Sequence, residues 1–267
     1  MSAIVKALPV TPISAIGKAY GGGFVTGVTV ENGQRYLNIT AGAAHELKGA
    51  WSARGVIIEG AGSFTDSRSN TESMAAAGSE LAQEVLALEI DGHTDWAIPA
   101  RDVQELQYRH LKPTTEENYC WGRDGDNPNS LPAGQLYTSE FPAQTALPAF
   151  QDDGEEAFSG SWYWSSTQRS ANYAFLMTFG VGSQNTSGKA NELRVRPVRR
   201  FDCWSVPVSG FGAGLLRLSA LEAKQRQCFG FRIESGTEPD PATRRPDRWH
   251  LPARPLDMLR GHSPESP

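Results

Sequence analysis

Residues 24–40 read FVTGVTVENGQRYLNIT and carry the clearest structural signal in the chain. Two runs rich in β-branched and aromatic residues flank the dipeptide Asn32-Gly33. Asn-Gly is the preferred pair for a type I′ turn, whose twist matches that of the strands it joins, so the stretch predicts an antiparallel β-hairpin. The glycines at 21–23 lack the later glycine and the βαβ setting of a nucleotide-binding loop, and we interpret them as a sharp entry into the first strand.

Two helices are expected after the hairpin. Across residues 71–89, apolar side chains recur at intervals of three and four, which predicts an amphipathic helix that Asn70 or Thr71 can cap. Pro99 begins a shorter helix near 100–111. The apolar face of the longer helix consists of Met74, Ala77, Leu81, Val85 and Leu88.

The second half of the chain is first loop-rich and then β-rich. Residues 112–160 are rich in Pro, Asn, Asp and Gly and are expected to form loops. A β-rich region begins at Trp162, residues 173–179 form a strand whose alternate side chains face opposite sides, and residues 192–201 form the closing strand. Short strands with two helices and long loops indicate an α+β fold.

The composition of the chain argues against several classes of partner. Its 267 residues carry a formal net charge of -5, and because nucleic-acid binding needs a basic face, no nucleic acid is expected. No apolar run approaches the roughly 18 residues of a membrane span, and no secretory signal peptide is predicted. Three cysteines in no metal-binding spacing indicate reduced thiols in a protein made in the cytoplasm. We interpret the one basic cluster as a solvated or structurally paired strand face: Arg194, Arg196, Arg199 and Arg200.

The sequence contains no recognisable active site. It has no GxSxG elbow, no phosphate-binding GxxxxGK loop and no histidine pair in metal-binding spacing. Cys120 could act as a nucleophile with His93 or His110, but any chain of this length offers such pairs. Residues 123–129, RDGDNPN, have oxygen ligands at alternate positions as calcium loops do, but they lack the closing glutamate and are also ordinary turn residues. We therefore expect no enzymatic activity, no cofactor and no metal ion, with calcium at this loop left open.

Residues 167–191, in contrast, have the composition of a binding surface. Aromatic side chains stand beside small, adaptable polar groups and glycines, as in antibody binding sites, although a plain exposed hairpin could have the same composition. The polar and aromatic residues of this segment are Gln168, Arg169, Asn172, Tyr173, Gln184, Asn185, Thr186, Ser187, Lys189 and Asn191.

Several motifs follow one another in order along residues 16–201. They are IGK followed by GGGF at 16–24, DWAIPARDVQEL at 95–106, LKPTT through RDGDNP at 111–128, WYWSST at 162–167 and RVRPVRRF at 194–201. This set resembles the Lcl C-terminal-domain family, a lectin-like domain of unknown function that phage tail proteins and bacterial surface adhesins often carry, and in particular a phage-encoded subgroup. Ala97 and Ala100 stand where the family usually has Arg and Thr, which weakens a local cap.

The resemblance implies a C-type-lectin-like fold, in which the N- and C-terminal strands pair, two helices flank the sheet and ligands meet loops at the far end. Some relatives are targets of diversity-generating retroelements, which rewrite codons between the WSS and VRR motifs. The positions of this sequence that match the rewritten stretch include Phe175 and Thr178, which join the candidate ligand-binding residues. The full candidate set is Arg169, Asn172, Tyr173, Phe175, Thr178, Gln184, Asn185, Thr186 and Asn191. The motif residues expected to hold the scaffold are Trp162, Trp164, Ser165, Arg196 and Arg199.

Four segments are expected: an N-terminal arm at 1–15, the C-type-lectin-like domain at 16–201, an extension of unknown fold at 202–235 and a disordered, proline-rich tail at 236–267. The resemblance implies a receptor-binding protein of the virion, at a phage tail tip or fibre, made in the host cytoplasm. Its partners would be a bacterial pilus, glycan or surface protein, other tail proteins and further copies of itself, with a trimer possible. The alternatives are a structural baseplate component and an oxidase of the formylglycine-generating type, which needs a pair of reactive cysteines.

Overall fold

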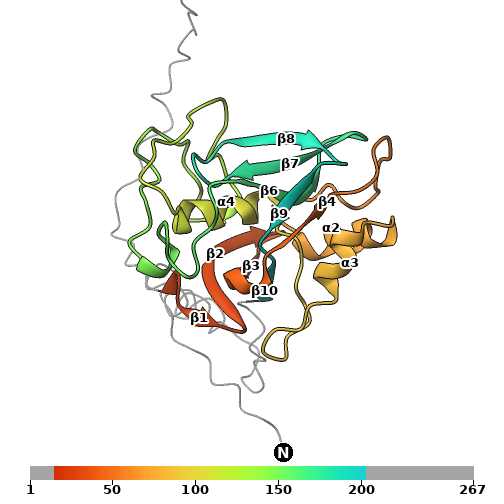
Figure 1. Ribbon diagram of the computed structural model, residues 1–267, viewed down its shortest axis with the longest axis horizontal. Helices are drawn as coiled ribbons and strands as arrows, with labels where there is room; N and C mark the ends of the chain where they lie inside the picture. The colour runs from red at the N-terminus through yellow and green to blue at the C-terminus, as the bar shows by residue number, and fades with distance from the viewer. Residues whose placement is uncertain (1–14, 203–267) are drawn as a thin grey trace, which may run out of the picture. The chain divides into compact units, whose positions relative to one another are not determined.

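The computed structural model describes residues 15–202, which contain ten strands and three α-helices (Figure 1). The strands are β1 (Ala19–Tyr20), β2 (Gly23–Glu31), β3 (Gln34–Thr40), β4 (Leu47–Ala50), β5 (Ser130–Leu131), β6 (Trp162–Gln168), β7 (Tyr173–Thr178), β8 (Gln184–Gly188), β9 (Glu192–Val195) and β10 (Val198–Asp202). The helices are α2 (Ser67–Ala76), α3 (Glu80–Leu86) and α4 (Arg101–Leu111), with 3-10 turns η1 (Ala43–His45) and η2 (Pro148–Phe150). Helices and mainly antiparallel sheets occur together, so these residues form an α+β fold, as predicted. Residues 1–14 of the expected arm, and the expected extension and tail beyond residue 202 with Cys203 and Cys228, lie outside the described residues.

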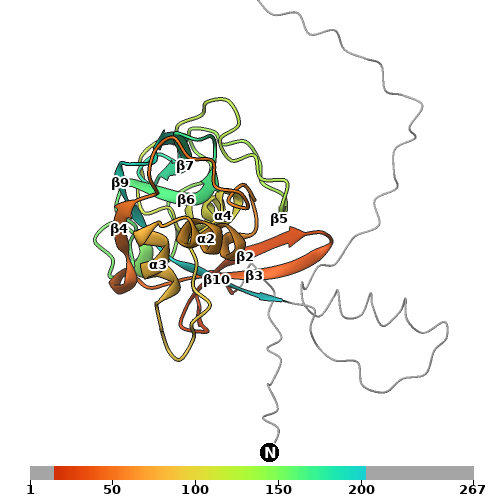
Figure 2. The same ribbon diagram turned by 90° about the vertical axis from the view of Figure 1, so that its right-hand side faces the viewer.

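The strands of residues 15–202 form two sheets of five strands each. The first sheet has the order β1-β2-β3-β10, with β5 beside β2, and the second has the order β4-β9-β6-β7-β8. α4 packs against β2 of the first sheet and against β6 and β7 of the second. Figure 2 shows α4 between the long β2–β3 hairpin and the strands of the second sheet.

The hairpin predicted at 24–40 is confirmed as β2 and β3. Asn32 and Gly33 form its two-residue turn, with φ angles of 50° and 78°. Positive φ at both positions is the type I′ geometry that an Asn-Gly pair favours. Gly21 and Gly22 also have positive φ and turn the chain tightly from β1 into β2, so the interpretation of these glycines as a sharp entry into the strand is confirmed as well.

The cap predicted for the helix at 71–89 is wrong. α2 begins earlier, after Asp66, whose side chain accepts a hydrogen bond from the Ser69 amide 3.1 Å away. Asn70 and Thr71 lie inside α2 and are fully buried. Their polar groups make hydrogen bonds within the fold, so these two residues fix α2 in place instead of starting it.

The apolar pattern at 71–89 spans a break between two helices. Between α2 and α3, Gly78 has a φ of 90°, a conformation that cannot continue a right-handed helix. Ser79 then caps α3 by accepting a hydrogen bond from an amide of its first turn. Ala77, which the pattern places on the apolar face, is exposed. The spacing of three and four continues across this break, and periodicity alone therefore predicts one helix where the structure has two.

α4 occupies the predicted range and links the two sheets. Ala100 precedes it without a side-chain cap, because alanine has no polar side-chain group, and its amide donates to the Ser67 hydroxyl at 2.8 Å. Gln104 donates to two backbone oxygens of β6 at 2.9 and 3.1 Å, and Gln107 donates to the Thr40 hydroxyl of β3 at 2.8 Å. Across residues 15–202, none of the helices has the length and apolar character needed to cross a bilayer.

The central strands of the second sheet are buried on both faces. One face packs into a cluster that includes Trp51, Val85, Trp164, Ala174 and Leu176. The other face packs into a cluster that includes Tyr108, Phe150, Tyr163, Met177 and Phe179. The alternation predicted for residues 173–179 is therefore present, and both sides of β7 contribute to the core.

The closing strand predicted at 192–201 is two strands in different sheets. β9 pairs with β4 and β6 in the second sheet, whereas β10 pairs with β3 in the first. Pro197 lies between them and has no amide hydrogen to give to a continuous ladder. Its carbonyl oxygen instead accepts a hydrogen bond from the Ala41 amide at 2.8 Å. The chain thus passes from the second sheet to the first at this proline.

The basic cluster of this region is paired with carboxylates. The Arg196 side chain is only 1% exposed and lies 3.1 Å from Glu46, which also bonds Arg194. Arg199 contacts Asp95 at 2.6 Å, and Arg200 has carboxylate partners as well. Of the two readings of the cluster, structural pairing is confirmed, whereas solvation is wrong for Arg196 because the surrounding fold covers its guanidinium.

Candidate recognition surface

Six of the nine candidate residues lie on β7 and β8, and the other three lie in adjoining turns. Side chains alternate across a strand, and the register places Phe175 opposite Thr186. One side of the pair, which we name the β7–β8 face, therefore carries Tyr173, Phe175, Gln184 and Thr186. The structure places Thr178 and Asn185 on the other side of the same two strands.

The three turn residues flank the end of the β7–β8 face at Tyr173. Arg169 and Asn172 are exposed in the turn between β6 and β7, and Asn191 is exposed in the turn between β8 and β9. The two turns lie side by side, because the Lys189 amide donates to the Asn172 carbonyl oxygen at 3.0 Å. Seven of the nine candidate residues therefore lie on this face or at its border.

Two residues that sequence reasoning missed complete the centre of the face. The ring of Phe64, 41% exposed, meets Phe175 edge-on with centroids 5.7 Å apart. The Arg101 guanidinium lies 5.3 and 5.7 Å from the two ring centroids and donates to Gln184 Oε1 at 3.3 Å. Both come from segments distant from 167–191 in sequence. Arg101 belongs to the DWAIPARDVQEL motif, whereas no sequence signal marks Phe64.

Lys189, grouped by composition with the surface residues, is fully buried, and Ser187 is buried as well. The Lys189 ammonium donates to the Val56 carbonyl oxygen at 2.8 Å and to Gln168 Oε1 at 2.6 Å, and it lies 4.6 Å from the centroid of the Trp51 ring. Burial lowers the pKa of Lys189 to about 8 by removing water from the ammonium. Its hydrogen-bond partners include no carboxylate that would offset this loss. These bonds fasten the turn after β8 and so fix one end of the β7–β8 face.

The loop at 123–126 holds the other end of the face. The Asp124 carboxylate accepts a hydrogen bond from the Gln184 amide at 3.0 Å, and the Gly125 amide donates to Gln184 Oε1 at 3.2 Å. Burial raises the pKa of the Asp124 carboxyl. Nowhere in residues 15–202 do three or more His, Cys, Asp or Glu gather in a way that could hold a metal ion. The contacts of this loop accordingly position the start of β8.

The residues considered as a nucleophile and its base are engaged with other partners. Cys120 is exposed, and its thiol donates to the Asn118 carbonyl oxygen at 3.2 Å. His110 Nδ1 contacts the Thr26 carbonyl oxygen, and burial lowers the pKa of the imidazole. The side chain of His93 makes no hydrogen bond to Cys120 either. Within the described part of the chain, the geometry gives no nucleophile–base pair at Cys120.

Trp162 differs from the other motif residues expected to hold the scaffold. Four of the five are buried: Trp164, Ser165, Arg196 and Arg199. The fifth, Trp162, stands at the start of β6 with 52% of its surface exposed. Its indole therefore contributes little to the core, and a role in holding the scaffold does not explain why a tryptophan stands at this position of the motif.

The chemistry that the β7–β8 face offers is that of binding. It presents aromatic surface beside amide and hydroxyl groups, on two paired strands whose ends are fixed by hydrogen bonds. No protein-family profile matches the chain, and no curated protein sequence matches it. The functional interpretation therefore depends on this geometry and on the motifs at 95–106, 162–167 and 194–201.

Proposed function

We propose that this chain is a non-enzymatic recognition protein with a C-type-lectin-like fold, carried on a phage tail fibre or tail tip, that binds a bacterial surface structure through the β7–β8 face. The observation that carries the proposal is the half-exposed ring of Tyr173 on the same side of β7 as Phe175, whose ring meets that of Phe64 from a neighbouring loop. Aromatic side chains lose little conformational entropy on binding, and the polar groups beside them adapt to the partner. A pilus, a glycan or a surface protein would suit such a face.

The arrangement of the motifs supports the C-type-lectin-like fold within this proposal. β10 pairs with β3, so the last described strand closes the sheet that the first hairpin begins. The three main motifs also meet in space. Asp95 of the first contacts Arg199 of the third, and Gln104 of the first donates to the Trp164 carbonyl oxygen of the second at 2.9 Å. Motifs that contact one another form a common scaffold, which is what a shared fold requires.

Presentation in several copies would add to the affinity. A small face with two exposed aromatic rings, Tyr173 and Phe64, binds weakly on its own, because association costs translational and rotational freedom. Linked copies make the later contacts intramolecular and raise the overall avidity by roughly 100-fold or more without any new contact. A homo-oligomer, held to other tail proteins in the virion, is therefore part of the proposal.

Two alternatives remain to be compared with this proposal. A structural baseplate role would bury the β7–β8 face against another chain of the particle, and the polar border of Arg169, Asn172 and Asn191 fits the rim of either kind of interface, so cell binding has to separate the two roles. An oxidase of the formylglycine-generating type needs a cysteine pair. Cys120 is the one cysteine among the described residues, and Cys203 and Cys228 lie outside them.

Cell binding tests the proposal. The full chain, fluorescently labelled, is titrated onto whole cells of a panel of bacterial strains, beside the variant Tyr173→Ala/Thr186→Ala. The wild type should label particular strains, and the variant should lose at least about tenfold in apparent affinity, because both side chains belong to the face. Phe175 is left unchanged because its ring supports Phe64 and Arg101.

The matched control is Asn185→Ala, which removes an exposed amide on the opposite side of β8. It should keep wild-type labelling, and thermal unfolding should show that both variants remain folded. If the wild type labels no strain, the recognition role fails and a structural role in the particle becomes the better explanation. If Asn185→Ala loses binding and the face variant does not, the contact lies on the other side of the sheet.

A further inference from the structure

The β2–β3 hairpin turns a polar side toward α4. Arg109 of α4 donates to the Ser130 hydroxyl of β5 at 3.0 Å, and Ser130 pairs with Thr29 of β2. Side chains of paired residues lie on the same side of a sheet, so Thr29 faces α4 as well. Asn38 of β3 donates to Thr29 Oγ1 at 3.0 Å. Figure 2 shows α2 and α4 on this side of the hairpin, which is therefore lined by hydrogen-bonded polar groups.

The opposite side of the same strands carries apolar residues in register. Val28 pairs with Leu131 of β5 and with Leu37 of β3, and Leu37 in turn pairs with Phe201 of β10. These four side chains, which we name the apolar row, lie next to one another across four strands on the side away from α4. Val28 is buried, whereas the other three are partly exposed. An antiparallel sheet buries its apolar side against another layer, so the row requires a cover.

The described residues form a core cluster with the row at one end only. The ring of Tyr20 lies against that of Phe201, with centroids 5.2 Å apart, and both pack on the cluster that contains Ile39 and Trp96. Within residues 15–202, the four core clusters include none of the other three residues of the row. A cover for these three belongs to another part of the chain or to a partner.

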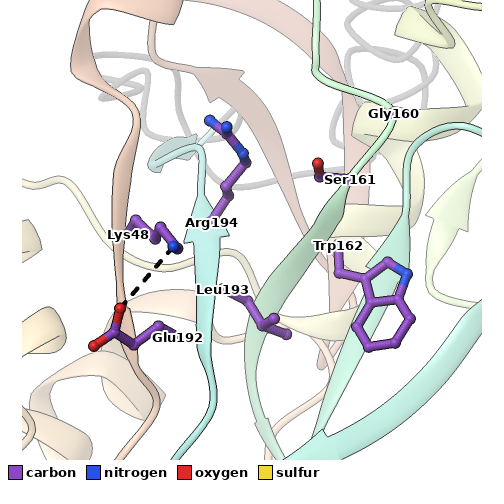
Figure 3. A pocket seen from close by; sticks show the side chains of 7 residues that line it. All are labelled: Lys48, Gly160, Ser161, Trp162, Glu192, Leu193 and Arg194. Atoms are coloured by element: carbon purple, nitrogen blue, oxygen red, sulfur yellow. Dashed lines mark ion pairs between the residues drawn. The ribbon is translucent and has the colours of Figure 1, made fainter.

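By contrast, the charged groups at the β4 edge of the second sheet have partners among the described residues. Figure 3 shows the pocket beside β4 and β9, where the Lys48 ammonium lies 4.0 Å from the Glu192 carboxylate. Arg194 of the same pocket is paired with Glu46. The pocket therefore offers a ligand no excess of charge, and the apolar row is the surface that calls for an occupant.

We propose that residues 211–221 of the same chain dock on the apolar row. β10 ends at Asp202, directly after Phe201, so the chain leaves the described strands at the row itself. Residues 211–221 read FGAGLLRLSAL, and this stretch is rich in leucine. Spacings of three and four residues are typical of one face of an amphipathic helix, and such a face can cover a sheet. The apolar side chains at these spacings are Phe211, Leu215, Leu218 and Leu221.

The connection is long enough for this contact. The row crosses four strands, a width of about 14 Å at the ordinary spacing of strands. Residues 203–210, which connect β10 to the docking segment, can span at most about 26 Å. A short tether gives an effective concentration in the millimolar range, so a contact with an intrinsic Kd on the order of 0.1 mM is closed about ten times more often than it is open. The same segment of a second copy lacks this advantage in dilute solution.

Hydrogen exchange of the full chain tests the docking. Amides of residues 211–221 should exchange about tenfold more slowly than in a free peptide of the same sequence, as the effective concentration implies. Leu37→Ser should remove most of this protection, because it puts a hydroxyl group into the row. Tyr36→Ser is the matched control, since the side chain of this neighbouring residue lies on the α4 side of β3, and it should keep the protection.

A second variant keeps the test independent of the stability of the described strands. Leu218→Ser changes only the docking segment, which lies outside residues 15–202. It should shift the methyl NMR signals of Leu37 and Leu131. The methyl signals of Leu193, which packs in the core of the second sheet, should stay where they are. Protection of residues 211–221 should also be the same at about 1 and 100 µM protein, because docking within one chain does not depend on concentration.

Three results would overturn the proposal. Exchange of residues 211–221 at the rate of the free peptide would show that nothing docks. Loss of protection in Tyr36→Ser but not in Leu37→Ser, or unchanged methyl signals in Leu218→Ser, would place the segment on another surface. Protection that rises with protein concentration would assign the row to a second copy of the chain. The row is separate from the β7–β8 face, so each of these outcomes leaves the test of cell binding unaffected.

Discussion

Replacing Lys189 with methionine should change how the stability of the protein depends on pH. Burial lowers the pKa of this lysine to about 8 from its ordinary 10.5, which corresponds to roughly 3 kcal/mol of unfavourable free energy for the charged ammonium. Below pH 8 the lysine is protonated in both the folded and the unfolded state, and the whole penalty applies. Between pH 8 and 10.5 the unfolded state binds more protons, so the free energy of unfolding rises with pH until the penalty is gone.

Urea unfolding of wild type and Lys189→Met at pH 7, 9 and 10.5, followed by circular dichroism, measures this effect. Other titrating groups cancel in the difference between the two proteins. Methionine also removes the hydrogen bonds to Val56 and Gln168, which adds a loss that does not vary with pH. Relative to the variant, the wild type should gain roughly 3 kcal/mol between pH 7 and 10.5. A difference that stays constant within about 0.5 kcal/mol would refute the reasoning, because the ammonium would then not be desolvated in the folded state.

Two further substitutions test the packing. Glu46→Gln removes the carboxylate that two arginines share, and because Arg196 is buried the free energy of unfolding should fall by about 3 kcal/mol in urea titrations. Glu72→Gln, which removes a more exposed ion-pair partner on α2, should cost less than about 0.5 kcal/mol, and equal losses would contradict the role of burial. Gly182→Ala should lower the melting temperature by several degrees, because the residue has a φ of 73° and a Cβ there would lie 2.4 Å from the Tyr108 ring. An unchanged melting temperature would show that the turn adapts.

Elements defined by local chemistry were predictable from the sequence. The turn at Asn32-Gly33 depends on two residues that accept positive φ, and that property needs no tertiary context. α4 begins where Pro99 and the apolar spacing predict. The break between α2 and α3 was missed because Gly78 interrupts the helix without interrupting the apolar spacing. The passage between sheets at Pro197 had a visible signal, since proline rarely lies within a continuous strand.

The candidate site was predictable as a segment but not as a face. Composition marks residues 167–191, yet only the register of β7 and β8 shows that Asn185 lies opposite to Tyr173. Phe64 and Arg101 reach the face through tertiary contacts, which no local pattern encodes. Lysine side chains on a surface segment are usually exposed. Lys189 is buried because residues distant in sequence, such as Val56, pack over it, and the local sequence does not show this.

The pairing of β3 with β10 has a consequence for how the chain folds. It joins Thr40 to Val198, 158 residues apart, so a long loop must close before this ladder forms. While the ribosome is still making the intervening residues, β3 has a partner on one edge only, and an open strand edge is a template for association with other chains. The time that this edge stays open, more than the formation of any single hairpin or helix, sets how exposed the nascent chain is to misassembly.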